Sequence, residues 1–258
     1  MIKGSKAYIA FAVAVVALGV LGLVYGDFAL VWQPVPPGLP GRSLLAYVCA
    51  ATTITVGMGL LFRQSARAAT TVLFIYVLLW LLLLKVPAVL TAPLVDASWL
   101  GCGETAVQVA GAWVLFALTH DRPTAIAGER GVRAAAVLYG LALLPCGLAH
   151  LVYSKETGDF VPSWLPGHIT WAYLTGVAYL AAAAAVLLRV FARPAAGLSA
   201  LMMGLFTLLV WVPGVCRSPG DRFQWTAMLI SLNLTAAAWV VAASYQRGPI
   251  FAIDRTSP

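Results

Sequence analysis

The chain has 258 residues, of which 62% are hydrophobic and only 10% are charged, and its mean hydropathy is +0.92. A soluble globular domain is about half apolar and about a quarter charged, so this composition excludes an ordinary soluble protein. The net charge of +7 does not indicate nucleic-acid binding, because the basic residues are scattered and form no stripe with aromatic residues. The sequence therefore predicts an integral membrane protein.

Eight apolar segments have about the 20 residues needed to cross a bilayer. They are, in chain order, residues 9–25, 43–62, 68–86, 99–119, 134–153, 169–188, 194–212 and 224–245. No A-x-A-type cleavage site follows the first segment, so we expect a retained helix and not a cleaved signal peptide. The third segment is expected to end where Val86 meets Pro87.

The two halves of the chain repeat each other at an offset of 126 residues. VPPGLPGRSLLAY at 35–47 returns as VPSWLPGHITWAY at 161–173. The same offset aligns scattered positions of three residue types, namely Arg63 with Arg189, Pro93 with Pro219, Trp99 with Trp225, and Trp113 with Trp239. We therefore expect an all-α polytopic protein with eight transmembrane helices in two tandem four-helix bundles. The units are 1–119 and 134–245, joined by a cytoplasmic linker at 120–133 and followed by a cytoplasmic tail at 246–258.

The distribution of positive charge gives the expected orientation. Four spans per unit leave both copies facing the same way, so the repeat is parallel, unlike the inverted repeats of many transporters. If the N-terminus is cytoplasmic, eleven of the sixteen Lys and Arg residues lie on the cytoplasmic side. This agrees with the positive-inside rule. We expect a multi-pass protein of the cell inner (plasma) membrane with both termini in the cytoplasm.

Glu104 is the most informative single residue, because an ionisable side chain within a span indicates a functional site by default. Gln108 lies four residues further along and is expected on the same helix face. Two structural alternatives remain open. Glu104 could lie close enough to the interface to be hydrated, or it could pair with Arg42 or Lys85.

Other candidate ligand-binding residues gather on the expected outer side. Two proline-stiffened loops on that face can cover the mouth of a helix bundle, and bundles bind ligands between their helices. The candidates are Asp27, Arg42, Trp99, His150, His168 and Trp225. The structural alternatives are an interfacial aromatic belt for the tryptophans and a packing role for the histidines. His168 takes the place of Arg42 in the second copy, which suggests a basic cap on a helix start.

Metal binding is not expected. Cys49, Cys102, Cys146 and Cys216 have no CxxC or other metal-ligand spacing, and the three histidines are dispersed. The sequence also contains no phosphate-binding glycine loop and no hydrolase or metalloprotease motif. No cofactor is evident from the motifs.

The second copy resembles the DoxX-like family. The matching residues are Gly147 with His150, FVP at 160–162, Leu165-Pro166, WAYLTG at 171–176, Leu187-Leu188 and Arg193. The resemblance implies small four-helix membrane proteins, among them DoxX and the DoxD-type subunit associated with thiosulfate:quinone oxidoreduction. That family usually has a glutamate three residues after the Thr-Gly of its second helix. Here Tyr179 occupies that position, and Thr53 occupies it in the first copy.

Three functions remain open at this stage. We expect a binding or accessory component with an outer-facing pocket, in contact with the bilayer and with a membrane or periplasmic protein partner, and not a stand-alone enzyme. The alternative is a membrane subunit of a quinone-linked oxidoreductase, with quinone as the ligand and Glu104 or His150 exchanging its proton. A further alternative is a small-molecule transporter. No nucleic-acid partner is expected.

Overall fold

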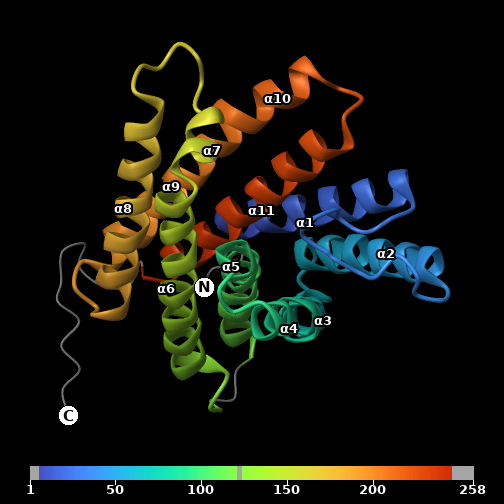
Figure 1. Cartoon of the computed structure of the whole chain (residues 1–258). Helices are drawn as coiled ribbons and strands as arrows, with labels where there is room; N and C mark the ends of the chain where they lie inside the picture. Colours follow the sequence, from blue (N-terminus) through green and yellow to red (C-terminus); the bar gives the residue numbers. More distant parts are fainter. Residues whose placement is uncertain (1–5, 121–123, 246–258) are drawn as a thin grey trace.

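The computed structural model describes residues 6–120 and 124–245, and within them all regular structure is helical (Figure 1). Eight helical segments of this part are long and apolar enough to cross a membrane. They are α1 (Lys6–Tyr25), α2 (Arg42–Leu61), α3 to α4 (Ala66–Thr91), α5 (Asp96–Thr119), α6 (Gly128–Val152), α8 (His168–Leu187), α9 to α10 (Ala192–Arg217) and α11 (Arg222–Ser244). The prediction of an all-α polytopic membrane protein is confirmed. The predicted tail at 246–258 lies outside the described residues.

Two of the spans contain a π-helical turn before a proline. α3 (Ala66–Trp80) continues through η1 (Leu81–Lys85) into α4 (Val86–Thr91), and α9 (Ala192–Phe206) continues through η2 (Thr207–Trp211) into α10 (Val212–Arg217). Proline has no N–H and its ring collides with the preceding turn, and a wider turn relieves both problems. The prediction that the third span ends at Val86 is therefore wrong, because the helix runs on past Pro87 to Thr91.

Local structure matches between the halves at the same offset of 126 residues. α2 and α8, α3 and α9, and α5 and α11 each begin at positions 126 residues apart. Gly41 and Gly167, which precede α2 and α8, both adopt left-handed backbone with φ of 69° and 72°. A short helix, α7 (Ser154–Asp159), lies in the second inter-helix loop.

The two halves interlock through their last long helices. α5 packs along α6 of the second half, α11 packs along α1 of the first half, and α5 and α11 also pack against each other. In Figure 1, α1 and α2 run across the view, α6 and α8 run up it, and α11 crosses between them. The expected units 1–119 and 134–245 are therefore in contact through α5 and α11, each of which packs against a helix of the other half.

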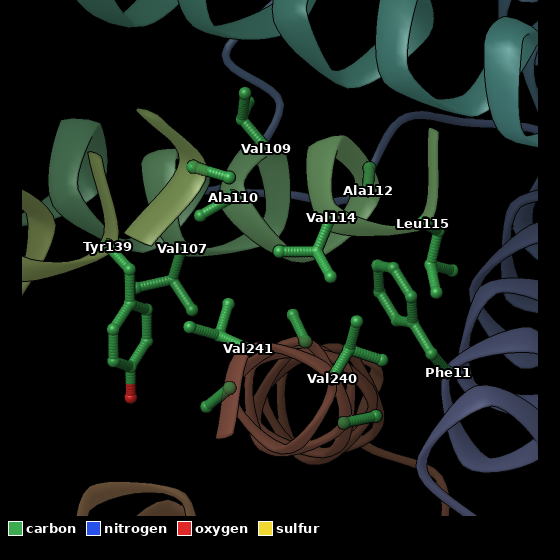
Figure 2. Packing of buried hydrophobic residues seen from close by; sticks show 14 of the residues in the cluster. Phe11, Val107, Val109, Ala110, Ala112, Val114, Leu115, Tyr139, Val240 and Val241 are labelled. Atoms are coloured by element: carbon green, nitrogen blue, oxygen red, sulfur yellow. The ribbon is translucent and has the colours of Figure 1, made fainter. Parts of the chain in front are cut away.

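Small residues permit this close packing. A side chain added at Gly111 of α5 would place its Cβ 2.7 Å from Cβ of Ala237 on α11. Around this crossing lies the apolar core shown in Figure 2, with Val107 and Val114 of α5 facing Val240 and Val241 of α11, and Phe11 of α1 at one edge. The centre of the protein thus consists of helices from both halves.

Candidate functional site

The second half encloses a cavity of about 800 Å³, which we call the large cavity. Small-molecule sites are usually clefts of about 300–1,000 Å³, so this volume suits a ligand. Its walls come from α6, α8, the α9–η2 segment, α11 and one side of α5, and the loop at 160–165 also lines it. Most of the lining is apolar, including Leu174, Met203, Leu209 and Leu234.

Glu104 enters the large cavity from α5, a helix of the first half. A close approach of α5 to α6 places Glu104 there. Gly103 has no side chain, and a Cβ there would lie 2.7 Å from Cγ of Pro145, so α5 can approach α6 closely. Oε2 of Glu104 accepts a hydrogen bond of 2.8 Å from the indole Nε1 of Trp32. Its other carboxyl oxygen has no hydrogen-bond partner within the described residues.

His150 lies near the end of α6 and also lines the large cavity. Its Nδ1 is 2.8 Å from Oγ1 of Thr175, whose hydroxyl donates to the carbonyl of Trp171 at 2.8 Å. With the Thr175 hydroxyl donating to a backbone carbonyl, Thr175 accepts from Nδ1–H, and in that tautomer the neutral ring keeps Nε2 as an acceptor. The imidazole stacks on Phe206, with ring centres 5.6 Å apart, and meets the edge of Tyr179 at 5.3 Å.

A row of aromatic rings connects the two long loops across the large cavity. The centroid of Trp32 is 6.0 Å from that of Phe223, Phe223 is 6.2 Å from Trp211, and Trp211 is 5.3 Å from Phe160. Trp32 belongs to the loop between α1 and α2, whereas Phe160 follows α7. The loop of the first half therefore contributes to the wall of a cavity in the second half.

A second cavity, of about 90 Å³, lies in the first half between α1, α2, α3 and α11. Since a water molecule takes about 30 Å³ of liquid, it has room for about three waters and is too small for a drug-sized ligand. Gln108 and Asn233 line it, and Oδ1 of Asn233 has no partner within the described chain. Gln108 and Glu104 therefore line different cavities, although one helical turn separates them.

Asp27 forms an ion cluster at the edge of this small cavity. Its carboxylate pairs with Arg42, and its Oδ2 lies 3.1 Å from Nη1 of Arg222 at the start of α11. Burial alone would raise the pKa of the Asp27 carboxyl. Hydrogen bonds from the Phe28 N–H, Arg222 and Arg42 outweigh it and hold the pKa below its ordinary value of 3.8. The cluster joins the first loop to the last helix.

Neither ion pair considered for Glu104 is present. Arg42 bonds to Asp27, and Nζ of Lys85 donates to the carbonyl of Val31 at 3.3 Å. Lys85 is buried, with 6% of its surface exposed, and its charge acts on Glu104, but the two form no ion pair in the described part of the chain.

The structure brings three of the candidate residues together in the large cavity, namely Glu104, His150 and Tyr179. Trp99 and Trp225 instead donate their indole protons to the carbonyls of Pro93 and Pro219, at 2.9 and 2.8 Å, and so stabilise turns within their own loops. His168 is the first residue of α8 and, like these two tryptophans, lines neither of the two cavities. Within the described residues, no three His, Cys, Asp or Glu side chains form a group that could hold a metal.

Several lining residues did not stand out in the sequence, among them Trp32, Cys146, Phe206 and Trp211. In sequence, an aromatic or sulfur-containing side chain on a span does not reveal whether it faces lipid, core or cavity. Trp32 carried the best available signal, because it lies two residues before Pro34, the first proline of the first loop.

Comparison with known proteins adds one family relation. The model of a domain of unknown function, DUF8561, matches residues 139–244, from within α6 to the end of α11. The matched stretch includes His150 and Tyr179 but not Glu104. No curated protein and no solved structure matches the chain.

Proposed function

We propose that this membrane protein binds a largely apolar small molecule in the large cavity and acts as a binding or accessory component. The observation that carries the proposal is the cavity itself, which has a ligand-sized volume of about 800 Å³ and places Glu104 and His150 on largely apolar walls. Glu156, Thr157 and Ser231 are further polar residues of the lining. Apolar walls with a few convergent polar groups are typical of small-molecule sites. The walls provide affinity, and the polar groups orient the ligand.

A quinone is the second candidate ligand, and the aromatic row from Trp32 to Phe160 favours it. Flat rings stack on aromatic side chains, and Trp32, Trp211 and Phe160 of this row line the cavity. In that case the protein would be a membrane subunit of a quinone-linked oxidoreductase, with electrons supplied by a partner protein.

We also propose that the chain consists of two tandem DoxX-like units in parallel orientation. The common helix starts at an offset of 126 residues and the paired left-handed glycines support the duplication. The acid that the DoxX-like pattern has at the position of Tyr179 is replaced in the same cavity by Glu104 of the other half. The excess of Lys and Arg on one side supports inner-membrane insertion with cytoplasmic termini.

The test is a substitution that fills the cavity and leaves its polar residues unchanged. Ala178 of α8 lines the large cavity, whereas Ala181, one turn further, is exposed and does not line it. The protein would be purified from native membranes in mild detergent and its bound small molecules identified by native mass spectrometry. We expect a lipophilic molecule on the wild type and on Ala181→Phe, and its loss from Ala178→Phe. Equal occupancy of both variants, or an empty wild type, would contradict the proposal.

A further inference from the structure

The polar groups that line the large cavity indicate the chemistry of the polar end of its ligand, which we call the head. Resting on the proposed function, we infer that the head is an uncharged hydrogen-bond donor, such as a hydroxyl or an amide N–H, and that it binds the free oxygen of Glu104. The ligand class is therefore a neutral lipophile with a donor head, such as a long-chain alcohol. A lipophilic cation does not fit this arrangement.

Glu104 supplies the main acceptor. Trp32 occupies Oε2 of the carboxylate, and Oε1 has no partner within the described residues, although the side chain lines the cavity. When the Glu104 carboxyl is ionised, it can only accept hydrogen bonds. An acceptor that faces an apolar cavity without a hydrogen-bond partner costs free energy. A donor on the ligand that bonds to Oε1 removes this cost and so contributes to the binding free energy.

His150 adds a second acceptor of the same kind. Its Nδ1–H is used by Thr175, so the neutral ring offers only Nε2 to the cavity. Two of the four indoles of the lining are in use, because Trp32 donates to Glu104 and Trp171 donates to the carbonyl of Pro166 at 3.1 Å. The indoles of Trp164 and Trp211, which also line the cavity, have no acceptor within the described residues. The hydroxyl of Tyr179 can either donate or accept, and so does not restrict the ligand.

Lys85 explains why the head carries no charge. This buried ammonium lies against α5 one turn before Glu104, where a Cβ on Gly101 would be 3.2 Å from its Nζ. Its positive charge offsets that of the carboxylate across a low-dielectric interior. A cationic ligand would leave an excess positive charge inside the membrane, which is costly. A neutral donor bonds to Glu104 and leaves this balance unchanged.

Trp32 is a positioning residue in this arrangement. Its indole holds Oε2 and thereby turns Oε1 toward the ligand, while its ring packs against Phe223. Trp32→Phe keeps an aromatic ring in that place but removes the donor. This change should reduce discrimination between ligand heads without reducing the affinity for an apolar chain.

The test uses two probes with the same chain, geranylgeraniol and geranylgeranyl methyl ether, on the full-length protein in nanodiscs. The alcohol can donate a hydrogen bond and the ether cannot. A hydrogen bond to a charged group contributes enough for a preference of about 10-fold or more. Native mass spectrometry of the bound fraction should show the alcohol binding to the wild type at least about 10-fold more tightly than the ether.

Variants at Glu104 and Gln108 separate the outcomes. In Glu104→Gln the amide can also donate to the ether oxygen, so the preference should fall to near 1. In Gln108→Leu, one turn along the same helix but lining the small cavity, the preference should remain. Equal binding of both probes to the wild type would overturn the donor inference and leave the proposed function standing. Binding of neither probe, or a preference that persists in Glu104→Gln, would also overturn the inference. An empty cavity after purification would contradict the proposed function instead.

Discussion

Replacing Gly111 by alanine tests whether the two halves are held together where α5 crosses α11. The new Cβ would lie 2.7 Å from Cβ of Ala237, 2.8 Å from its Cα and 3.1 Å from its carbonyl oxygen. Carbon atoms in contact are normally about 3.5–4.0 Å apart, so the two helices must separate by about 1 Å. Overpacking of this kind costs about 1–3 kcal/mol of unfolding free energy.

Alanine also favours a helix over glycine by about 0.8–1.0 kcal/mol, which offsets part of the cost. Gly197 of α9 provides the matched control, because a Cβ at that position meets no atom within 4 Å. Gly197→Ala therefore keeps the helix-propensity gain and has no packing cost. The difference in stability between the two variants isolates the cost at the crossing, and we expect Gly111→Ala to be about 1–3 kcal/mol less stable than Gly197→Ala.

The assay is SDS-induced unfolding in mixed micelles, followed by circular dichroism and tryptophan fluorescence. Equal unfolding midpoints for Gly111→Ala and Gly197→Ala would show that α5 and α11 do not meet at Gly111, and the interlocked arrangement would then be incorrect.

Further predictions concern the ion cluster and the topology. Asp27→Asn should lower stability at pH 7 by about 1–3 kcal/mol, because the neutral side chain leaves Arg222 without its carboxylate partner. The pKa of Asp27 lies below its ordinary value of 3.8, so its contribution is complete above that value and is lost as the pH falls through the folded-state pKa. Unfolding measured from pH 6 down to pH 3 should therefore show a smaller decline for Asp27→Asn than for the wild type, and parallel curves would contradict this. The orientation can be tested with Ser163→Cys and Gln64→Cys, two exposed positions, in a cysteine-free background. Only Ser163→Cys should react with a membrane-impermeant thiol reagent added from outside. Reaction of Gln64→Cys alone would overturn the orientation.

Hydropathy and spacing were enough to predict the number, type and approximate limits of the spans. The error at Val86 arose because a proline in an apolar run permits either a helix end or a π turn, and the apolar pattern does not distinguish the two. Glu104 was identifiable because a carboxylate in a span is costly and therefore informative.

The bonding partner of Glu104 and the residues that share its cavity were not predictable from the sequence. Trp32 is 72 residues away along the chain, and His150 belongs to a different half. Their meeting depends on α5 packing along α6 instead of closing a bundle with α1. The repeat favours two self-contained bundles, since each copy carries a full set of four spans. Nothing in a periodic apolar pattern distinguishes contacts within a copy from contacts exchanged between copies.

The exchanged helices impose an order on biosynthesis. When α5 enters the membrane, the helices that will surround Glu104 have not yet been made, because α6, α8 and α9 all follow it in the chain. The first half stays unfinished for longer still, since the face of α1 that receives α11 is covered only when the last helix emerges. A chain that ends after α10 would leave uncovered the face of α1 and the Gly111 surface of α5 that pack against α11. A fusion that delays the insertion of α11 should therefore lower the amount of protein, although it changes no residue of the ligand cavity.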